Sequence, residues 1–121
     1  MGKRTWACLA VTLLALLAGA APAFAGGWAI ISLDALPADL RAGQAQQIGF
    51  TVLQHGITPT NRDLDGNTLV PVLTITPLDA AAGKAQEFTA RPEGATGHFI
   101  ADVTFPAAGR WAWSIQLPTY M

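Results

Sequence analysis

The sequence predicts an all-β sandwich of about six to seven short antiparallel strands. Three observations lead to this fold class. Apolar and polar residues alternate over windows of strand length, and clusters of glycine, proline, asparagine and aspartate separate these windows. After the first 25 residues, no window of helix length shows a 3.6-residue period. Turns at this spacing are typical of two packed sheets.

The N-terminus has the parts of a secretory signal peptide, which we assign to residues 1–25. Lys3 and Arg4 form a positive n-region, an apolar run follows, and Ala23-Phe24-Ala25 supplies the small residues that signal peptidase requires. We expect cleavage after Ala25, export to the periplasm or cell exterior, and no stable membrane span afterwards. The alternative is a retained anchor, although the apolar run is short for a bilayer core, which needs about 20 residues.

Cleavage leaves one domain, residues 26–121, which must be held together by packing alone. The only cysteine, Cys8, lies in the signal peptide, so the mature domain has no disulfide, thiolate nucleophile or cysteine metal ligand. Its five basic and eight acidic residues give a net charge of −3. This mild negative charge provides no electrostatic basis for binding nucleic acid or an anionic membrane.

Two strands are predicted in the first part of the domain. Trp28–Leu33 is apolar at positions that would face both sides of a sheet, which predicts a central or covered strand. After a turn-rich connection, Gln47–His55 alternates and places Ile48, Phe50 and Val52 on one face. A polar loop follows as far as about Thr68.

The middle of the domain has weaker strand signals. Leu69–Ile75 is rich in β-branched residues, and Pro71 within it predicts an edge position or a bulge. Asp79–Lys84 is too short to form a stable helix and contains a glycine. Gln86–Ala90 is predicted to be a short edge strand.

The last two predicted strands supply much of the core. His98–Phe105 alternates with its apolar residues on one face, and the final strand places Trp111, Trp113, Ile115 and Leu117 on a single face. We expect both indoles to face the core and not to form an exposed binding platform. The number and spacing of the strands indicate an immunoglobulin-like sandwich.

The domain lacks the residue patterns of an enzyme. Ser32 and Ser114 both fall within predicted strands, and neither lies in a nucleophile elbow. Asp34 and Asp39 lie in turn-rich sequence, where solvated acids are the usual interpretation. We therefore predict a non-enzymatic protein with no catalytic residue and no expected cofactor, with copper as the one alternative.

A calcium site is a weaker possibility in the polar loop. Asn61, Asp63, Asp65 and Gly66 match the first half of a calcium loop, with oxygen ligands at positions 1, 3 and 5. Position 12, where a glutamate should complete the shell, is Val72. The alternative is an ordinary loop in which these side chains bind their own backbone.

His55 and His98 are the only histidines in the sequence, so they are the candidate imidazole ligands for copper. Both fall at the ends of predicted strands, and they could share a metal ion if the fold brought them together at one end of the sandwich. The alternative is that each histidine makes local hydrogen bonds in its own turn.

Four segments of the mature chain resemble the YtkA-like domains, which are related to the FixH group. These segments are Gly26–Ala29, Gly49–Pro59, Glu93–Phe99 and Gly109–Trp113. The resemblance implies an extracytoplasmic immunoglobulin-like domain that accompanies larger membrane or electron-transfer proteins. It also implies copper handling and cytochrome oxidase assembly, with which some relatives are associated. It carries over no catalytic residue, and the cleavable signal departs from the membrane-anchored FixH pattern.

The resemblance and the residue patterns agree on one corner, Gln54-His55-Gly56. Gly56 is expected to adopt a positive φ that leaves His55 outward. We therefore predict an exported accessory or binding domain that contacts an envelope protein or small ligand through its loop ends, with Gln54, His55, Gly56 and His98 as binding residues. The alternatives are a copper carrier that uses His55 and His98, and a calcium-stabilised structural module.

Overall fold

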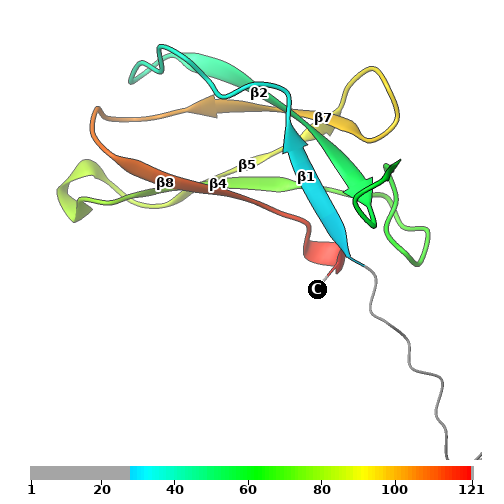
Figure 1. Cartoon of the computed structure of the whole chain (residues 1–121). Helices are drawn as coiled ribbons and strands as arrows, with labels where there is room; N and C mark the ends of the chain where they lie inside the picture. The colour runs from blue at the N-terminus through cyan, green and yellow to red at the C-terminus, as the bar shows by residue number, and fades with distance from the viewer. Residues whose placement is uncertain (1–27, 121) are drawn as a thin grey trace, which may run out of the picture.

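Two antiparallel β-sheets pack face to face in the computed structural model, which describes residues 28–120 (Figure 1). One sheet has the order β1-β2-β7-β6, with β3 paired to β2, and the other has the order β5-β4-β8. The strands are β1 (Ala29–Leu33), β2 (Ala45–Gln54), β3 (Thr58–Pro59), β4 (Val72–Pro77), β5 (Gln86–Thr89), β6 (Arg91–Pro92), β7 (His98–Thr104) and β8 (Trp111–Gln116). The predicted all-β sandwich is confirmed.

The expected signal peptide, residues 1–25, and its cleavage site lie outside the described residues. Among residues 28–120, no helix has the length and apolar character needed to cross a membrane. The helical segments described are the short 3-10 turns η1 (Ala80–Ala82) and η2 (Pro118–Tyr120). The η1 turn lies within the segment that was predicted to be too short for a stable helix.

The core forms where β2 and β7 pair and face β4. The residues with exposed fractions of 3% or less include Ile48, Phe50, Val52, Leu73, Ile75, Phe99, Ala101 and Val103. The rings of Phe50 and Phe99 stack with centroids 5.9 Å apart and an interplanar angle of 16°. The alternation predicted for these two strands therefore selects the correct inner face, because successive side chains of a strand point to opposite faces.

The prediction of a central or covered first strand is wrong. β1 pairs with β2 on one side and lies at the edge of its sheet. Its side chains alternate between half-buried and exposed, and Trp28 and Ile30 are 53% and 43% exposed. An apolar run shows that both faces carry apolar side chains, but it does not show what covers each face.

The prediction of an edge or bulged strand at Leu69–Ile75 is also wrong. β4 begins after Pro71 and lies between β5 and β8, so it is the central strand of its sheet. Pro71 precedes the ladder, and its carbonyl accepts a hydrogen bond from Ala90 N (2.9 Å). Because Pro71 stands one position before the ladder, its missing N–H removes no hydrogen bond from the residue pairs of β4 itself. β5 is an edge strand, as predicted.

The two tryptophans of the last strand face the core, as predicted, but they are only half-buried. Trp111 and Trp113 pack against the buried cluster, and Trp111 makes an edge-to-face contact with Phe105 at 5.8 Å. The indole Nε1 of Trp111 donates to the carbonyl of Ala107 (3.1 Å).

We expect Phe50→Ala to lower the free energy of unfolding by about 3–5 kcal/mol, because it removes a fully buried ring and leaves a cavity beside Phe99. Ile57→Ala is the control, since Ile57 is 79% exposed and its loss should change stability by less than about 0.5 kcal/mol. Urea unfolding followed by circular dichroism measures both. Similar values for the two variants would contradict the assigned core.

Candidate functional site

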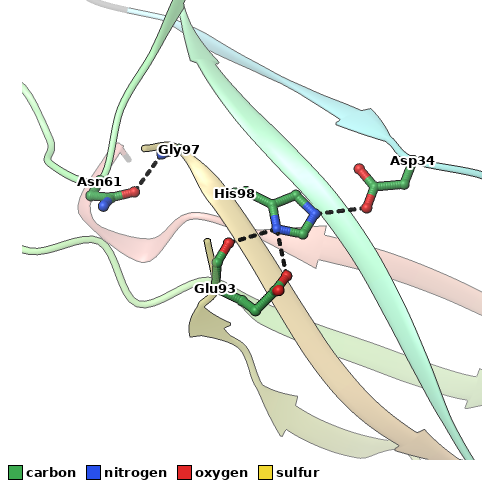
Figure 2. A network of polar contacts seen from close by, with 5 residues as sticks. All are labelled: Asp34, Asn61, Glu93, Gly97 and His98. Atoms are coloured by element: carbon green, nitrogen blue, oxygen red, sulfur yellow. Dashed lines mark hydrogen bonds and ion pairs between the residues drawn. The ribbon is translucent and has the colours of Figure 1, made fainter. Parts of the chain in front are cut away.

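His98, the first residue of β7, lies between two carboxylates on the outer face of the five-stranded sheet (Figure 2). Its Nε2 is 2.7 Å from Asp34 Oδ2, and its Nδ1 is 2.8 Å from the Glu93 carbonyl oxygen and 2.9 Å from Glu93 Oε2. Carbonyl oxygens and ionised carboxylates only accept hydrogen bonds. Both ring nitrogens must therefore donate to satisfy these contacts, which favours the charged imidazolium.

The fold builds this cluster from three separate segments. Asp34 follows β1, and its backbone N–H donates to the carbonyl of Gly49 (3.0 Å). The Asp34 carboxylate lies directly over Gly49, where an added Cβ would collide with it. Glu93 follows β6 and donates its N–H to the His98 carbonyl (3.0 Å). The register of the sheet therefore determines which groups meet His98.

The surroundings of His98 raise its pKa above the ordinary value of 6.5. The hydrogen bond to the Asp34 carboxylate contributes most, and the Glu93 carbonyl contributes next. Partial burial opposes the charged form, and the negative charges of both acids favour it. The result is an ion-paired histidine with a side chain 20% exposed.

The turn before His98 is tied to the polar loop. Gly97 N donates to the side-chain oxygen of Asn61 (2.6 Å), as Figure 2 shows. Gly97 has a φ of +83°, and an added Cβ would lie 2.7 Å from Thr60 N. The close approach of the two segments thus requires glycine at this position.

The side chain of Asp63, which the sequence suggested as a calcium ligand, binds its own loop. Asp63 Oδ1 accepts from the backbone N–H groups of Asp65 (2.9 Å) and Asn67 (2.8 Å), and Oδ2 accepts from the Asn67 amide (3.1 Å). Burial alone would raise the pKa of Asp63, but these hydrogen bonds lower it below its ordinary value. This arrangement is the backbone-binding alternative for Asp63, whereas the Asn61 side chain accepts from Gly97, which lies in a different segment.

The predicted Gln54-His55-Gly56 corner forms at the end of β2. His55 N donates to the Trp28 carbonyl (2.8 Å), and the two rings meet edge to face at 6.0 Å. Gly56 has the expected positive φ, +72°, and His55 itself also has a positive φ, +51°. The side chain of His55 is exposed, as expected.

The two histidines occupy separate environments. His98 is opposite Thr51 in the β2–β7 register, and Thr51 precedes His55 by four residues. At about 3.3 Å per residue this is about 13 Å along the strand. No group of three or more His, Cys, Asp or Glu side chains within residues 28–120 has an arrangement that could hold a metal ion. Copper binding by His55 and His98 stays a prediction.

The sequence did not reveal the two acids that hold His98. Asp34 was interpreted as a solvated turn residue, and Glu93 was not considered as a partner of His98. The available signal was positional, because Asp34 directly follows one predicted strand and His98 directly begins another. Only the register of the intervening β2 strand brings these two residues together.

Comparison of the chain with protein-family models, with curated proteins and with solved structures found no match. The described residues define an all-β sandwich with an ion-paired histidine on its outer face.

We expect Asp34→Asn to lower the pKa of His98, because it removes the strongest acceptor and one negative charge. Because the folded pKa of His98 is raised, its stabilising contribution is complete below pH 6.5 and is lost as the pH rises through the folded pKa. The stability difference between wild type and variant should therefore be largest just below pH 6.5 and should shrink as the pH rises through the folded pKa of His98.

Nuclear magnetic resonance titration of the His98 ring and urea unfolding at several pH values measure these two effects. Asp39→Asn is the matched control, since Asp39 lies in the same connection and asparagine tolerates its positive φ of 55°. An unchanged His98 pKa in Asp34→Asn would contradict the ion pair.

We expect Asp63→Ala to lower the melting temperature in calcium-free buffer, because it leaves the N–H groups of Asp65 and Asn67 without their acceptor. Asp65→Ala is the control and should change the melting temperature little. Under the calcium alternative, added calcium raises the melting temperature of the wild type, and the variant that combines Asp63→Ala with Asp65→Ala abolishes this rise. Differential scanning calorimetry with and without calcium separates the two cases.

Proposed function

We propose that the chain is an exported, non-enzymatic accessory domain that binds an envelope protein or a small ligand through the loop ends of its sandwich. The observation that carries this proposal is an exposed apolar corner around His55. The resemblance to YtkA-like domains supports the same class of function.

The corner consists of Trp28, Ile30, His55, Gly56 and Ile57, and we call it the Trp28 corner. Trp28, Ile30 and Ile57 are 53%, 43% and 79% exposed. Gly56 lies against the indole, because a Cβ placed there would be 3.0 Å from the Trp28 ring and 3.7 Å from the Ile30 side chain. Ile57 is the next residue of the same turn. Exposed apolar side chains beside an aromatic ring are typical of an interaction surface.

Charged groups on the same sheet could orient a partner. The Trp28 corner lies where β1 begins and β2 ends, and the His98 cluster lies beside an earlier part of β2, opposite Thr51, on the outer face. Arg91 and Asp102 form an ion pair with a distance of 2.5 Å on β6 and β7. An apolar anchor beside fixed charges favours a partner with an apolar contact residue and polar groups around it.

We expect Ile57→Asp to abolish partner capture without changing the melting temperature, because it places a charge in the Trp28 corner at an exposed position. The purified exported protein, immobilised and incubated with native envelope extract under cross-linking, provides the measurement. Leu78→Asp is the matched control, since Leu78 is 60% exposed and precedes η1 in the other sheet's connection.

We expect the wild type and Leu78→Asp to capture a partner, and we expect Ile57→Asp to capture at least ten-fold less of it. Equal capture by all three proteins, or consistent failure of the wild type to capture a partner, would count against the proposal.

A further inference from the structure

β8 is an edge strand whose neighbour lies on one side only. It pairs with β4 in the register Leu73↔Ile115 and Ile75↔Trp113. No strand within residues 28–120 pairs with its other side. An unprotected edge of this kind can hydrogen-bond to an added strand.

The register shows which backbone groups point away from β4. Leu78 N donates to Arg110 O (3.0 Å), so these residues form a hydrogen-bonded pair one position beyond the strand. Such pairs alternate along an antiparallel ladder. Ala112, Ser114 and Gln116 therefore bond to β4, whereas Trp113 and Ile115 direct their N–H and C=O groups toward the free edge.

The inner face of β8 is incompletely covered along its whole length. Its inward side chains, Trp111, Trp113, Ile115 and Leu117, are all half-buried, whereas Leu73 and Ile75 of the neighbouring β4 are fully buried. Two open cavities lie along this side. One, of about 290 Å³, is lined by Phe105, Trp111, Trp113 and Arg41 among others.

The second cavity, of about 400 Å³, lies at the other end of β8. It is lined by Ile115, Leu117 and Tyr120 from one side and by Trp28, Ala29 and Ile31 from the other. Figure 1 shows the C-terminal turn η2 beside the start of β1. The first cavity lies beside the beginning of β8 and the second lies between its end and β1, and we call the surface along β8 that includes both the β1–β8 groove.

The strand order explains why the groove exists. In seven-stranded immunoglobulin sandwiches, strands A, B, E and D form one sheet and strands C, F and G form the other. The order β1-β2-β7-β6 corresponds to A, B, E and D, while β4 and β8 correspond to C and F. Strand G would pair with β8 on its free side, and no described strand takes that position.

We infer that the β1–β8 groove receives an extended segment of a partner protein, which adds to the sheet as a strand antiparallel to β8. Its alternate side chains would be apolar and would fill the two cavities. Its backbone would pair with Trp113 and Ile115. Added strands of this kind obtain affinity from main-chain hydrogen bonds and specificity from pockets for alternate side chains.

Charge favours a partner segment with an acidic C-terminal end. A segment antiparallel to β8 ends beside Trp111, where Arg41 lines the cavity, and neither cavity is lined by an acidic residue. The β8 strand of a second copy would instead place Gln116 and Leu117 beside Arg41. Charge complementarity therefore favours a separate partner over a second copy of this chain.

A synthetic peptide tests this inference with the purified exported protein. The probe has about eight residues, enough to span β8 with one residue beyond each end. It alternates valine with threonine and ends in aspartate. Saturable binding should shift the tryptophan emission to shorter wavelengths, because the peptide covers the indoles of Trp111 and Trp113.

Two controls separate an added strand from general apolar binding. A peptide N-methylated at the residues that face β8 keeps its apolar side chains but loses its donors, and it should bind at least about ten-fold more weakly. Arg41→Glu should weaken binding of the aspartate-ended peptide at least as much. Lys84→Glu, which makes the same charge change at an exposed site outside the groove, should bind as the wild type does.

The inference goes beyond the proposed function, and its failure can be distinguished. Trp28 belongs to both surfaces, but Ile57 does not line either cavity of the groove, so Ile57→Asp should bind the peptide as the wild type does. Equal binding of the N-methylated peptide, or no binding at about 1 mM, would overturn the inference. Sedimentation that shows a dimer with emission unaffected by peptide would also overturn it, since a second copy would then occupy the edge.

Discussion

The antiparallel pairing of β2 with β7 is the contact on which both the core and the His98 cluster depend. The same register places Phe50 opposite Phe99 and Thr51 opposite His98. A slip of one residue would move every side chain of a strand to the other face. Burial of the stacked phenylalanine rings on the inner face therefore also fixes the position of His98 on the outer face, next to the glycine that makes room for Asp34.

The sequence predicted the strands whose pattern reports directly on one buried face. The alternation in β2 and β7 identified Phe50, Val52 and Phe99 because each strand has one inner and one outer side. It did not predict the neighbours of a strand. β1 looked central because both its faces are apolar, and β4 looked peripheral because Pro71 stands one residue before it. Strand order depends on contacts between distant segments, which local composition does not encode.

The same distinction separates the parts of the candidate site. The hydrogen bonds of Asp63 are local, because its side chain accepts from backbone N–H groups two and four residues further along the chain. This arrangement was one of the two alternatives that the sequence predicted. The pairing of His98 with Asp34 spans 64 residues and was missed. Asp34 resembles any solvated aspartate after a strand until the register across Gly49 is known. Charge and residue type alone could not identify this pair.

The last strand shows that facing inward differs from being buried. The period-2 pattern correctly turned Trp111 and Trp113 toward the core, but an inner face is covered only where the opposite sheet extends across it. β8 lies across from the sheet edge at β1, whose inner side chains there are Ala29 and Ile31. An indole that could bury about 200 Å² but is half-covered gives up about 2 kcal/mol of hydrophobic stabilisation. An added strand would recover part of this free energy from both indoles, in addition to its backbone hydrogen bonds. The half-buried residues of β8 are thus the residues that would gain most burial when an extended segment binds.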